Sequence, residues 1–209
     1  MSLRSTATAE LSFAHRFVRH QRSESMGKQF DEITPELTEW LREQKLFFVA
    51  TAPISPDGAL NCSPKGMDTF RILGSREVGY LDLTGSGIET AAHLSENGRI
   101  VIMFCAFTGP PKIVRFHGRG SYHPAGLPAF EQRRSAFPIL PGTRGIVSVE
   151  VSRISDSCGF AVPLYEFQGE RDTLVRWAES KGSEGLKAYR QQRNAKNIDG
   201  LPGLGSEEV

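Results

Sequence analysis

The chain has 209 residues, 39% of them hydrophobic, and its 25 Lys and Arg residues nearly balance 24 Asp and Glu residues. This suits one globular domain with a proper core, and a net charge of +1 gives no overall attraction to nucleic acid or to an acidic membrane. No apolar run approaches the roughly 20 residues of a transmembrane helix. The three cysteines, Cys62, Cys105 and Cys158, follow neither a disulfide nor a metal-binding pattern, which indicates a reducing compartment such as the cytoplasm.

Residues 1–25 differ from the rest of the chain, because they carry four arginines, several serines and no hydrophobic core segment. An Arg- and Ser-rich segment with a weak amphipathic face is typical of a mitochondrial presequence. A disordered leader, or sequence upstream of a true start at Met26, explains the same residues. The acidic residues Glu10 and Glu24 favour this second interpretation.

The first half of the chain predicts one helix followed by four strands. Thr34-Pro35 begins the helix well, since a hydroxyl cap and a proline in the first turn precede Leu37, Trp40 and Leu41 at helical spacing. Turns separate the strands that follow. These strands are expected at residues 45–52, 59–65, 69–73 and 78–83.

The second half continues with a helix that begins near Ser86 and ends at Asn97-Gly98, a good C-terminal stop. Many short strands with tight links and few helical crossovers predict an antiparallel barrel or sandwich. Two charged helices with Gly182 between them close the chain. The remaining elements are expected as strands at 99–107, 112–122 and 145–154, and helices at 127–137, 171–181 and 183–195.

The most informative segment is the turn at Thr84-Gly85-Ser86-Gly87-Ile88-Glu89-Thr90, where an apolar strand runs into a helix. The first N–H groups of a helix lack intrahelical partners and carry partial positive charge, so such a turn can seat a phosphate. The same residues also match a capping box, in which Ser86 and Glu89 satisfy each other's backbone N–H groups. The residues alone leave both interpretations open.

Familiar catalytic motifs are absent from the sequence. It contains no dinucleotide-binding glycine motif, no phosphate loop and no nucleophile elbow, and its five histidines show no metal-ligand spacing. A metal site or a hydrolytic triad therefore has no local support. What remains is a scattered set of polar groups: Lys65 at a strand end, the turn at 84–90, and Lys112 with Arg115 on a later strand.

Three local pieces stand out within this set: Asn61-Cys62-Ser63-Pro64-Lys65-Gly66, then Leu83-Thr84 followed by Leu94-Ser95-Glu96-Asn97-Gly98-Arg99, and finally Val114-Arg115-Phe116-His117-Gly118. Together with the order of strands and helices over residues 44–152, they resemble the pyridoxamine 5′-phosphate oxidase-like family of FMN-binding split barrels. The resemblance implies a mainly β, α+β fold: an antiparallel split β-barrel with peripheral helices at 26–168 and a C-terminal helical extension at 169–209. It also implies a homodimer with FMN at each of two interface clefts, and hydride transfer between a small substrate and FMN N5.

The resemblance also assigns roles to individual residues, although it names no catalytic residue. The first strand of the match lays its backbone along FMN, and its terminal Lys65 reaches the substrate phosphate. Arg134 matches a substrate-binding arginine. The residues expected to bind FMN are Asn61, Cys62, Ser63, Lys65, Leu83, Thr84, Ser86, Thr90, Lys112 and Arg115.

The chain departs from the authentic oxidases at the phosphate end of the flavin. Glu89 and Thr90 stand where those enzymes place an Arg-Lys pair on the FMN phosphate, and Ile113 replaces a glutamine that contacts the ring. We therefore expect a divergent branch of the family, in which hydroxyls, backbone and a cation from another strand hold the phosphate. The candidates for that cation are Lys65, Lys112 and Arg115.

Three functions remain in competition. The first, which we favour, is an FMN-dependent oxidoreductase acting on a small unidentified substrate. The second is a barrel that binds a flavin, deazaflavin or haem without turnover. The third is a structural dimer that has lost its cofactor, as Glu89 would permit. We expect no nucleic-acid, membrane or metal partner.

Overall fold

The computed structural model describes residues 27–205, so the expectations for a leader at 1–25 lie outside the described residues. None of the helices in this range is long and apolar enough to cross a membrane. The strands are β1 (Gln29–Phe30), β2 (Phe47–Thr51), β3 (Asn61–Lys65), β4 (Phe70–Gly74), β5 (Glu77–Leu83), β6 (Arg99–Cys105), β7 (Ile113–Pro124) and β8 (Thr143–Ser157). The helices are α1 (Pro35–Glu43), α2 (Glu89–Asn97), α3 (Pro128–Arg134) and α4 (Thr173–Arg193).

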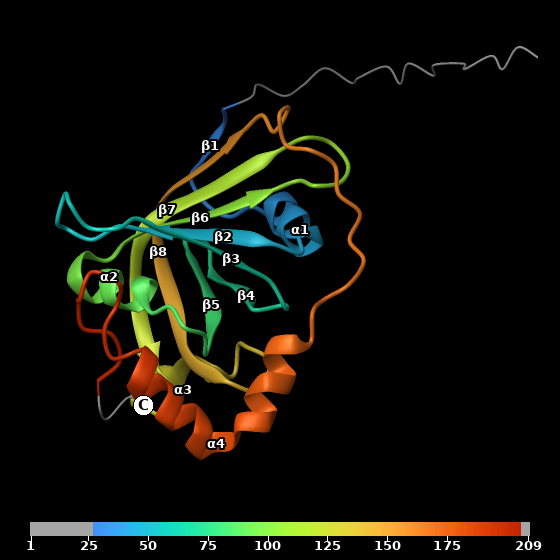
Figure 1. The fold of residues 1–209 in the computed structure, drawn as a ribbon. Helices are drawn as coiled ribbons and strands as arrows, with labels where there is room; N and C mark the ends of the chain where they lie inside the picture. Colours follow the sequence, from blue (N-terminus) through green and yellow to red (C-terminus); the bar gives the residue numbers. More distant parts are fainter. Residues whose placement is uncertain (1–26, 206–209) are drawn as a thin grey trace, which may run out of the picture.

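The eight strands form one antiparallel sheet, which curves into a barrel with helices around it (Figure 1). The strand order is β3-β2-β6-β7-β8-β5-β4, and the short β1 pairs with the far end of β8. Within the described residues no pairing joins the edge strands β3 and β4, so the barrel is open between them. The predicted antiparallel split barrel with peripheral helices is therefore confirmed.

The long strands β7 and β8 connect the two halves of the barrel. One end of β8 pairs with β5, while β7 runs along its whole length. The β7–β8 register shifts between His117 and Gly118, and a Cβ at Gly118 would collide with the Glu150 carbonyl oxygen. Glycine at this position therefore permits the bulge that bends the strand.

An aromatic cluster fills the barrel. Phe47 lies 5.4 Å from Phe104 and 5.6 Å from Tyr80, measured between ring centroids, and Phe70 packs edge-on against Phe104 at 4.9 Å. Phe116, fully buried, extends the cluster toward β7. Buried side chains alternate along β2 and most of β6, as a sheet with one buried face requires, whereas β5 is buried at consecutive positions.

The boundaries of α1 and α2 follow the predicted signals in part. Thr34 caps α1 by accepting the Leu37 N–H at 3.2 Å, and α2 ends at Gly98 in the left-handed conformation, as predicted. The capping box of Ser86 and Glu89, one of the two interpretations of this turn, does not form, because α2 begins at Glu89 and its N-cap, Ile88, makes no side-chain cap bond. Tertiary contacts, described below, hold the residues before Ile88 out of the helix.

The C-terminal region contains the two predicted helices, joined as α4 with a break at Gly182 (φ 62°, ψ 177°). A connection at residues 158–172, here called the strap, leads from β8 along the outside of the barrel to α4 (Figure 1). The strap is attached to the β6–β7 turn, where the Tyr165 N–H donates to the Phe107 carbonyl at 2.9 Å. The division of the chain at 168/169 stays a prediction.

Candidate functional site

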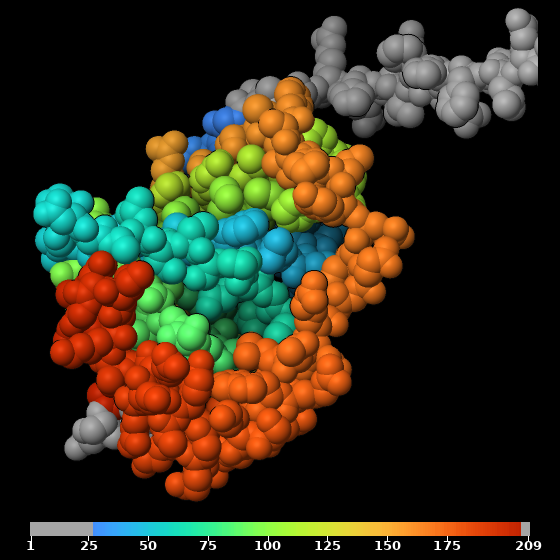
Figure 2. Space-filling view, in the orientation of Figure 1, coloured from blue at the N-terminus to red at the C-terminus, as the bar shows by residue number. Residues whose placement is uncertain are grey.

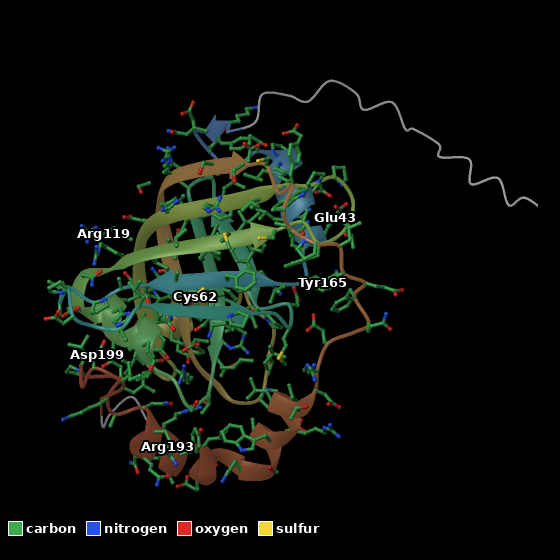
Figure 3. The ribbon with its side chains drawn as sticks, turned by 45° about the horizontal axis from the view of Figure 1, so that its top comes forward. Glu43, Cys62, Arg119, Tyr165, Arg193 and Asp199 are labelled. Carbon is green, nitrogen blue, oxygen red and sulfur yellow. The ribbon has the colours of Figure 1, made fainter. Side chains whose placement is uncertain are left out.

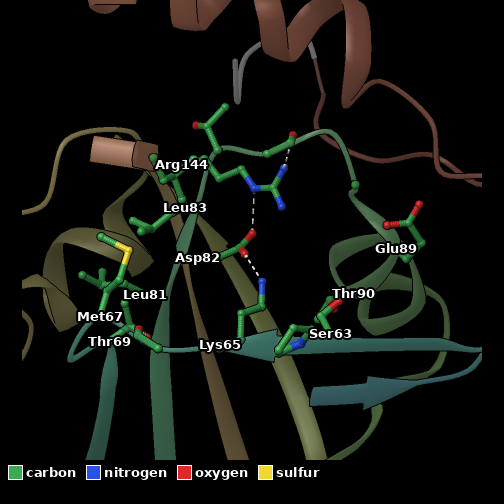
Figure 4. Close-up of a pocket in the computed structure, with 16 residues that line it drawn as sticks. Ser63, Lys65, Met67, Thr69, Leu81, Asp82, Leu83, Glu89, Thr90 and Arg144 are labelled. Carbon is green, nitrogen blue, oxygen red and sulfur yellow. Dashed lines mark hydrogen bonds and ion pairs between the residues drawn. The ribbon is translucent and has the colours of Figure 1, made fainter. Parts of the chain in front are cut away.

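A cavity of about 410 Å³ lies between β3, the end of β5 and the start of α2 (Figure 4). Its volume is within the range of small-ligand sites. Arg144 from β8 lies opposite Lys65 of β3, with the carboxylate of Asp82 between them, while Glu89 and Thr90 stand on the α2 side. Apolar side chains complete the wall: Pro64, Met67, Leu81, Leu83 and Leu174.

Half of the ten residues predicted to bind FMN line this cavity, namely Ser63, Lys65, Leu83, Thr84 and Thr90. They converge because β3 begins beside the start of α2, where Asn61 contacts Thr90, and ends at Lys65, which reaches Asp82 near the end of β5. Asn61 lies directly behind them, donating to Thr90 Oγ1 at 3.0 Å and accepting the Ser63 hydroxyl at 3.0 Å.

The other predicted residues lie elsewhere in the described chain. Cys62 is exposed on the outer face of β3 (Figure 3). Lys112 places its ammonium 5.1 Å from the centre of the Trp40 ring, and Arg115 donates to Ser157 Oγ at 2.8 Å. Arg134 donates to the Phe137 carbonyl at 2.8 Å. Within the described part of one chain, none of these four lines the cavity, and their ligand-binding roles stay predictions.

Asp82 is the electrostatic centre of the site. It accepts from Arg144 Nε at 2.7 Å and from Lys65 Nζ at 3.2 Å, and only 2% of its surface is exposed. Burial by itself would raise the pKa of this carboxyl, but the charges of Arg144 and Lys65 outweigh it and lower the pKa to about 2. Asp82 is therefore ionised at neutral pH and holds both cations in place.

The turn at 84–87 is held by the C-terminal region. Asn194, which is fully buried, donates to the Gly85 carbonyl at 3.0 Å and accepts from Arg144 Nη1 at 2.9 Å. Arg190 Nε donates to Thr84 Oγ1 at 3.0 Å. Ser86 does not line the cavity, and its carbonyl accepts from Asn194 at 3.4 Å. These contacts explain why the helix starts at Glu89 and not beside Ser86.

A second polar chain leads from behind the cavity to the C-terminal segment. His93 on α2 is fully buried between Thr51 Oγ1, 2.9 Å from its Nδ1, and Asn197 Nδ2, 3.4 Å from its Nε2. Burial lowers the pKa of His93, which favours the neutral ring at pH 7. We therefore assign His93 to holding the C-terminal segment on α2, and not to proton transfer in the cavity.

The charges that line the cavity balance. Lys65 and Arg144 contribute two positive charges, while Asp82 and Glu89 contribute two negative ones. Sequence reasoning missed Asp82, Arg144, Arg190 and Asn194. The available signal was a charge inside an apolar strand, since Asp82 follows Tyr80-Leu81 and such a buried charge requires a partner. The sequence gives no sign of which partner that would be.

Comparison with known proteins identifies the family. A family model described as Pyridoxamine 5′-phosphate oxidase matches residues 33–157. "Pyridoxamine 5′-phosphate oxidase family protein ustO" of Aspergillus flavus is 35% identical over 194 residues, covering 85% of this chain and 78% of that protein.

Two solved structures resemble the fold at low sequence identity. One, a putative pyridoxamine 5′-phosphate oxidase from Lactobacillus delbrueckii, is 13% identical with a TM-score of 0.46, covering 62% of this chain and 98% of that one. Another, a FAD-binding protein from Mesorhizobium loti, is 14% identical with a TM-score of 0.44, covering 63% and 97%. On the family match and the curated relative, the chain belongs to the pyridoxamine 5′-phosphate oxidase family.

Proposed function

We propose that this protein is a flavin-dependent oxidoreductase that binds FMN in the cavity between β3, β5 and α2. It would transfer hydride to or from a small substrate. The observation that carries the proposal is the convergence of Ser63, Lys65, Leu83, Thr84 and Thr90 on one cavity in a member of this family.

The cavity has an apolar part suited to a flat ring system. Met67, Leu81, Leu83 and Leu174 line this part. When bound, FMN supplies the hydride acceptor or donor, and the protein supplies position and electrostatics. The apolar side chains would fix the plane of the ring and exclude water from it.

The opposite part is suited to a polar tail. Gly85 leaves open space where a side chain would otherwise stand, so a ligand can approach the backbone there. Arg144 is the lining cation nearest the turn, donating to the Gly85 carbonyl at 3.3 Å. Arg190, behind Thr84, adds a second positive charge. We propose Arg190 as the main cation that one chain provides for a phosphate, because Arg144, like Lys65, is already paired with Asp82. The roles of Lys112 and Arg115 stay predictions.

Lys65 has a narrower role than the resemblance implied. Its ammonium is bound to the ionised Asp82, so its charge is partly neutralised before any ligand arrives. A hydrogen-bonded lysine held in one direction can still donate to a ligand oxygen or ring nitrogen. We therefore propose that Lys65 orients ligand in the cavity and contributes little net attraction for phosphate.

A second candidate is a protein of this fold that binds a cofactor without turnover, or that has lost it. Glu89 favours this alternative, because its carboxylate lines the cavity and lies over Gly87 beside the start of α2. A fixed negative charge there opposes a phosphate. The balanced charge of the cavity is consistent with either candidate.

We also propose a homodimer in a reducing compartment such as the cytoplasm. Leu60 and Ile198 are 81% and 74% exposed, and their segments meet where the Ala59 N–H donates to Asp199 Oδ2 at 2.9 Å. Large apolar side chains exposed on two segments that meet support an association surface there. The cysteines Cys62, Cys105 and Cys158 are all free, in keeping with a reducing compartment. Light scattering on the full chain measures the oligomeric state directly.

The decisive experiment is an absorption spectrum of the purified full chain, followed by titration with FMN and reduction by NADPH. The leading proposal predicts a flavin spectrum and stoichiometric FMN binding at micromolar concentration. Absence of FMN binding at that concentration contradicts it. Binding without reduction by NADPH, or by pyridoxamine 5′-phosphate with oxygen, favours the non-catalytic alternative. Parallel titrations with FAD, riboflavin and haem identify the preferred ligand.

A further inference from the structure

A groove of about 600 Å³ adjoins the proposed flavin cavity on the side of the strap. Gly66, Met67 and Leu174 line both spaces, so the two are continuous. Figure 2 shows the surface hollowed where the β3–β4 region faces the strap and the start of α4. A ligand lying in the groove would therefore reach the proposed flavin at its open side.

The groove is formed mainly by apolar side chains. Its large apolar lining residues are Leu46, Met67, Phe167, Leu174 and Trp177. The Trp177 ring is fixed by an edge-on contact with Tyr189, at 5.0 Å between centroids. A fixed aromatic ring in an apolar groove favours an apolar or aromatic ligand group.

Backbone strain marks the border between the groove and the cavity. Met67 and Asp68 both have positive φ, 63° and 53°, which is uncommon for residues other than glycine. Arg71 holds this conformation, because its guanidinium binds both carboxylate oxygens of Asp68, at 2.9 and 3.0 Å. Strained residues that the surrounding structure holds in place cluster at ligand sites. Here the strain places Met67 between the two spaces.

The charges around the groove do not select a phosphate. Lys45, Glu170 and Arg171 line it, but all three are exposed, where water weakens their attraction for a ligand. Lys65, which the family resemblance assigned to the substrate phosphate, is bound to Asp82 in the neighbouring cavity. No described cation of this chain is therefore both buried and directed into the groove.

We infer that this groove is the substrate subsite, and that it takes an uncharged aromatic or aliphatic group instead of a phosphate ester. The inference rests on the proposed flavin in the adjoining cavity. Phe167, Leu174 and Trp177 determine the specificity, and all three lie outside residues 33–157, the part that the family model matches. The extension would thus give this chain a substrate class different from that of the vitamin B6 oxidases.

The test uses the full-length chain with Trp40→Phe, which leaves Trp177 as its one tryptophan, since the sequence contains two. Benzyl alcohol and benzyl phosphate are the probes, because they share a ring and differ in the phosphate. Benzyl alcohol should change the Trp177 emission in a saturable manner, and benzyl phosphate should bind no more tightly. Phe167→Ala should weaken benzyl alcohol binding about fivefold.

Phe160→Ala is the matched control, because Phe160 is an exposed phenylalanine of the same strap that lines none of the described cavities. It should leave benzyl alcohol binding unchanged. The inference is overturned if benzyl phosphate binds about tenfold more tightly than benzyl alcohol, or if the two alanine variants behave alike. Flavin fluorescence gives the FMN affinity of the same proteins separately. If benzyl alcohol binds saturably but FMN does not bind, the groove takes an apolar ligand and the proposed function is contradicted. If FMN binds but benzyl alcohol does not change the Trp177 emission, only the inference about the groove is contradicted.

Discussion

Arg144 and Asp82 are separated by 62 positions in the chain, yet Arg144 Nε donates to Asp82 Oδ2 at 2.7 Å inside the barrel wall. The side chains of both residues are almost fully buried. Lys65 approaches the same carboxylate from the edge strand β3. The pair thus connects the strands that form the cavity with the C-terminal region that covers it, since Arg144 also donates to Asn194.

Removing the Asp82 charge should destabilise the protein strongly. Asp82→Asn leaves Arg144 and Lys65 without their counter-charge, and breaking a buried ion pair in this way costs about 3 kcal/mol or more. Urea unfolding measures the loss. Asp172→Asn is the control, because Asp172 also binds an arginine but its side chain is 69% exposed. Equal, small effects of the two substitutions would contradict the structural role of Asp82.

The same carboxylate should make stability fall in acid. The pKa of Asp82 is about 2 in the folded protein, below the ordinary value of 3.8, so its contribution to the free energy of unfolding is complete above about pH 4. Protonation removes that contribution as the pH falls from 4 toward 2. Urea titrations across this range should show a steeper loss for the wild type than for Asp82→Asn. If the stability of the two proteins falls equally with pH, groups other than Asp82 cause the acid destabilisation.

Glu89 should weaken the binding of flavin phosphate. Glu89→Gln removes the negative charge while keeping the size of the side chain, so we expect FMN to bind about tenfold more tightly. Riboflavin, which lacks the phosphate, should bind as before. Quenching of flavin fluorescence gives both affinities. If the affinity for riboflavin rises as much as the affinity for FMN, Glu89 does not act on the phosphate.

Lys65 should matter more for turnover than for flavin retention. In Lys65→Ala the cavity loses an oriented donor, but Arg144 and Arg190 remain, so we expect kcat to fall about tenfold or more while the Kd for FMN changes little. Lys187→Ala, on the exposed face of α4, serves as the control. Equal losses of turnover and FMN affinity in Lys65→Ala would contradict this assignment.

The C-terminal region should stabilise the barrel through Asn194. The Asn194 side chain is fully buried and hydrogen-bonds to both Arg144 and the Gly85 carbonyl. Asn194→Ala therefore leaves buried polar groups unpaired, at a cost of about 2 kcal/mol in the free energy of unfolding. Thermal unfolding should show a clear fall in Tm. Gln191→Ala, at an exposed position in the last turn of α4, just before Asn194, should change Tm little. Similar melting of the two variants would show that the extension is attached by other contacts.

Much of the fold follows from local signals in the sequence. The Thr34 cap, the left-handed Gly98 and the break at Gly182 each act within a few residues, so they can be recognised without any partner. The capping box at Ser86 and Glu89, one of the two interpretations of the turn, rests on the same kind of signal and does not form. There the backbone of 85–86 is bound by Asn194, from a segment more than a hundred residues away.

By itself, the sequence determined the order of strands and helices and the position of the turn at 84–90, because hydrophobic periodicity and caps are local properties. The pattern predicted an antiparallel barrel or sandwich, and the split barrel followed from the family resemblance. Only the tertiary structure decided which charges meet at that turn. Of the expected cations, Lys65 lies there and pairs with Asp82, while the roles of Lys112 and Arg115 stay predictions. The contacts of Asp82 with Arg144, and of Thr84 with Arg190, were not foreseen. The reason is physical: a buried charge must find a counter-charge, and chain topology, not sequence distance, determines which one lies within reach.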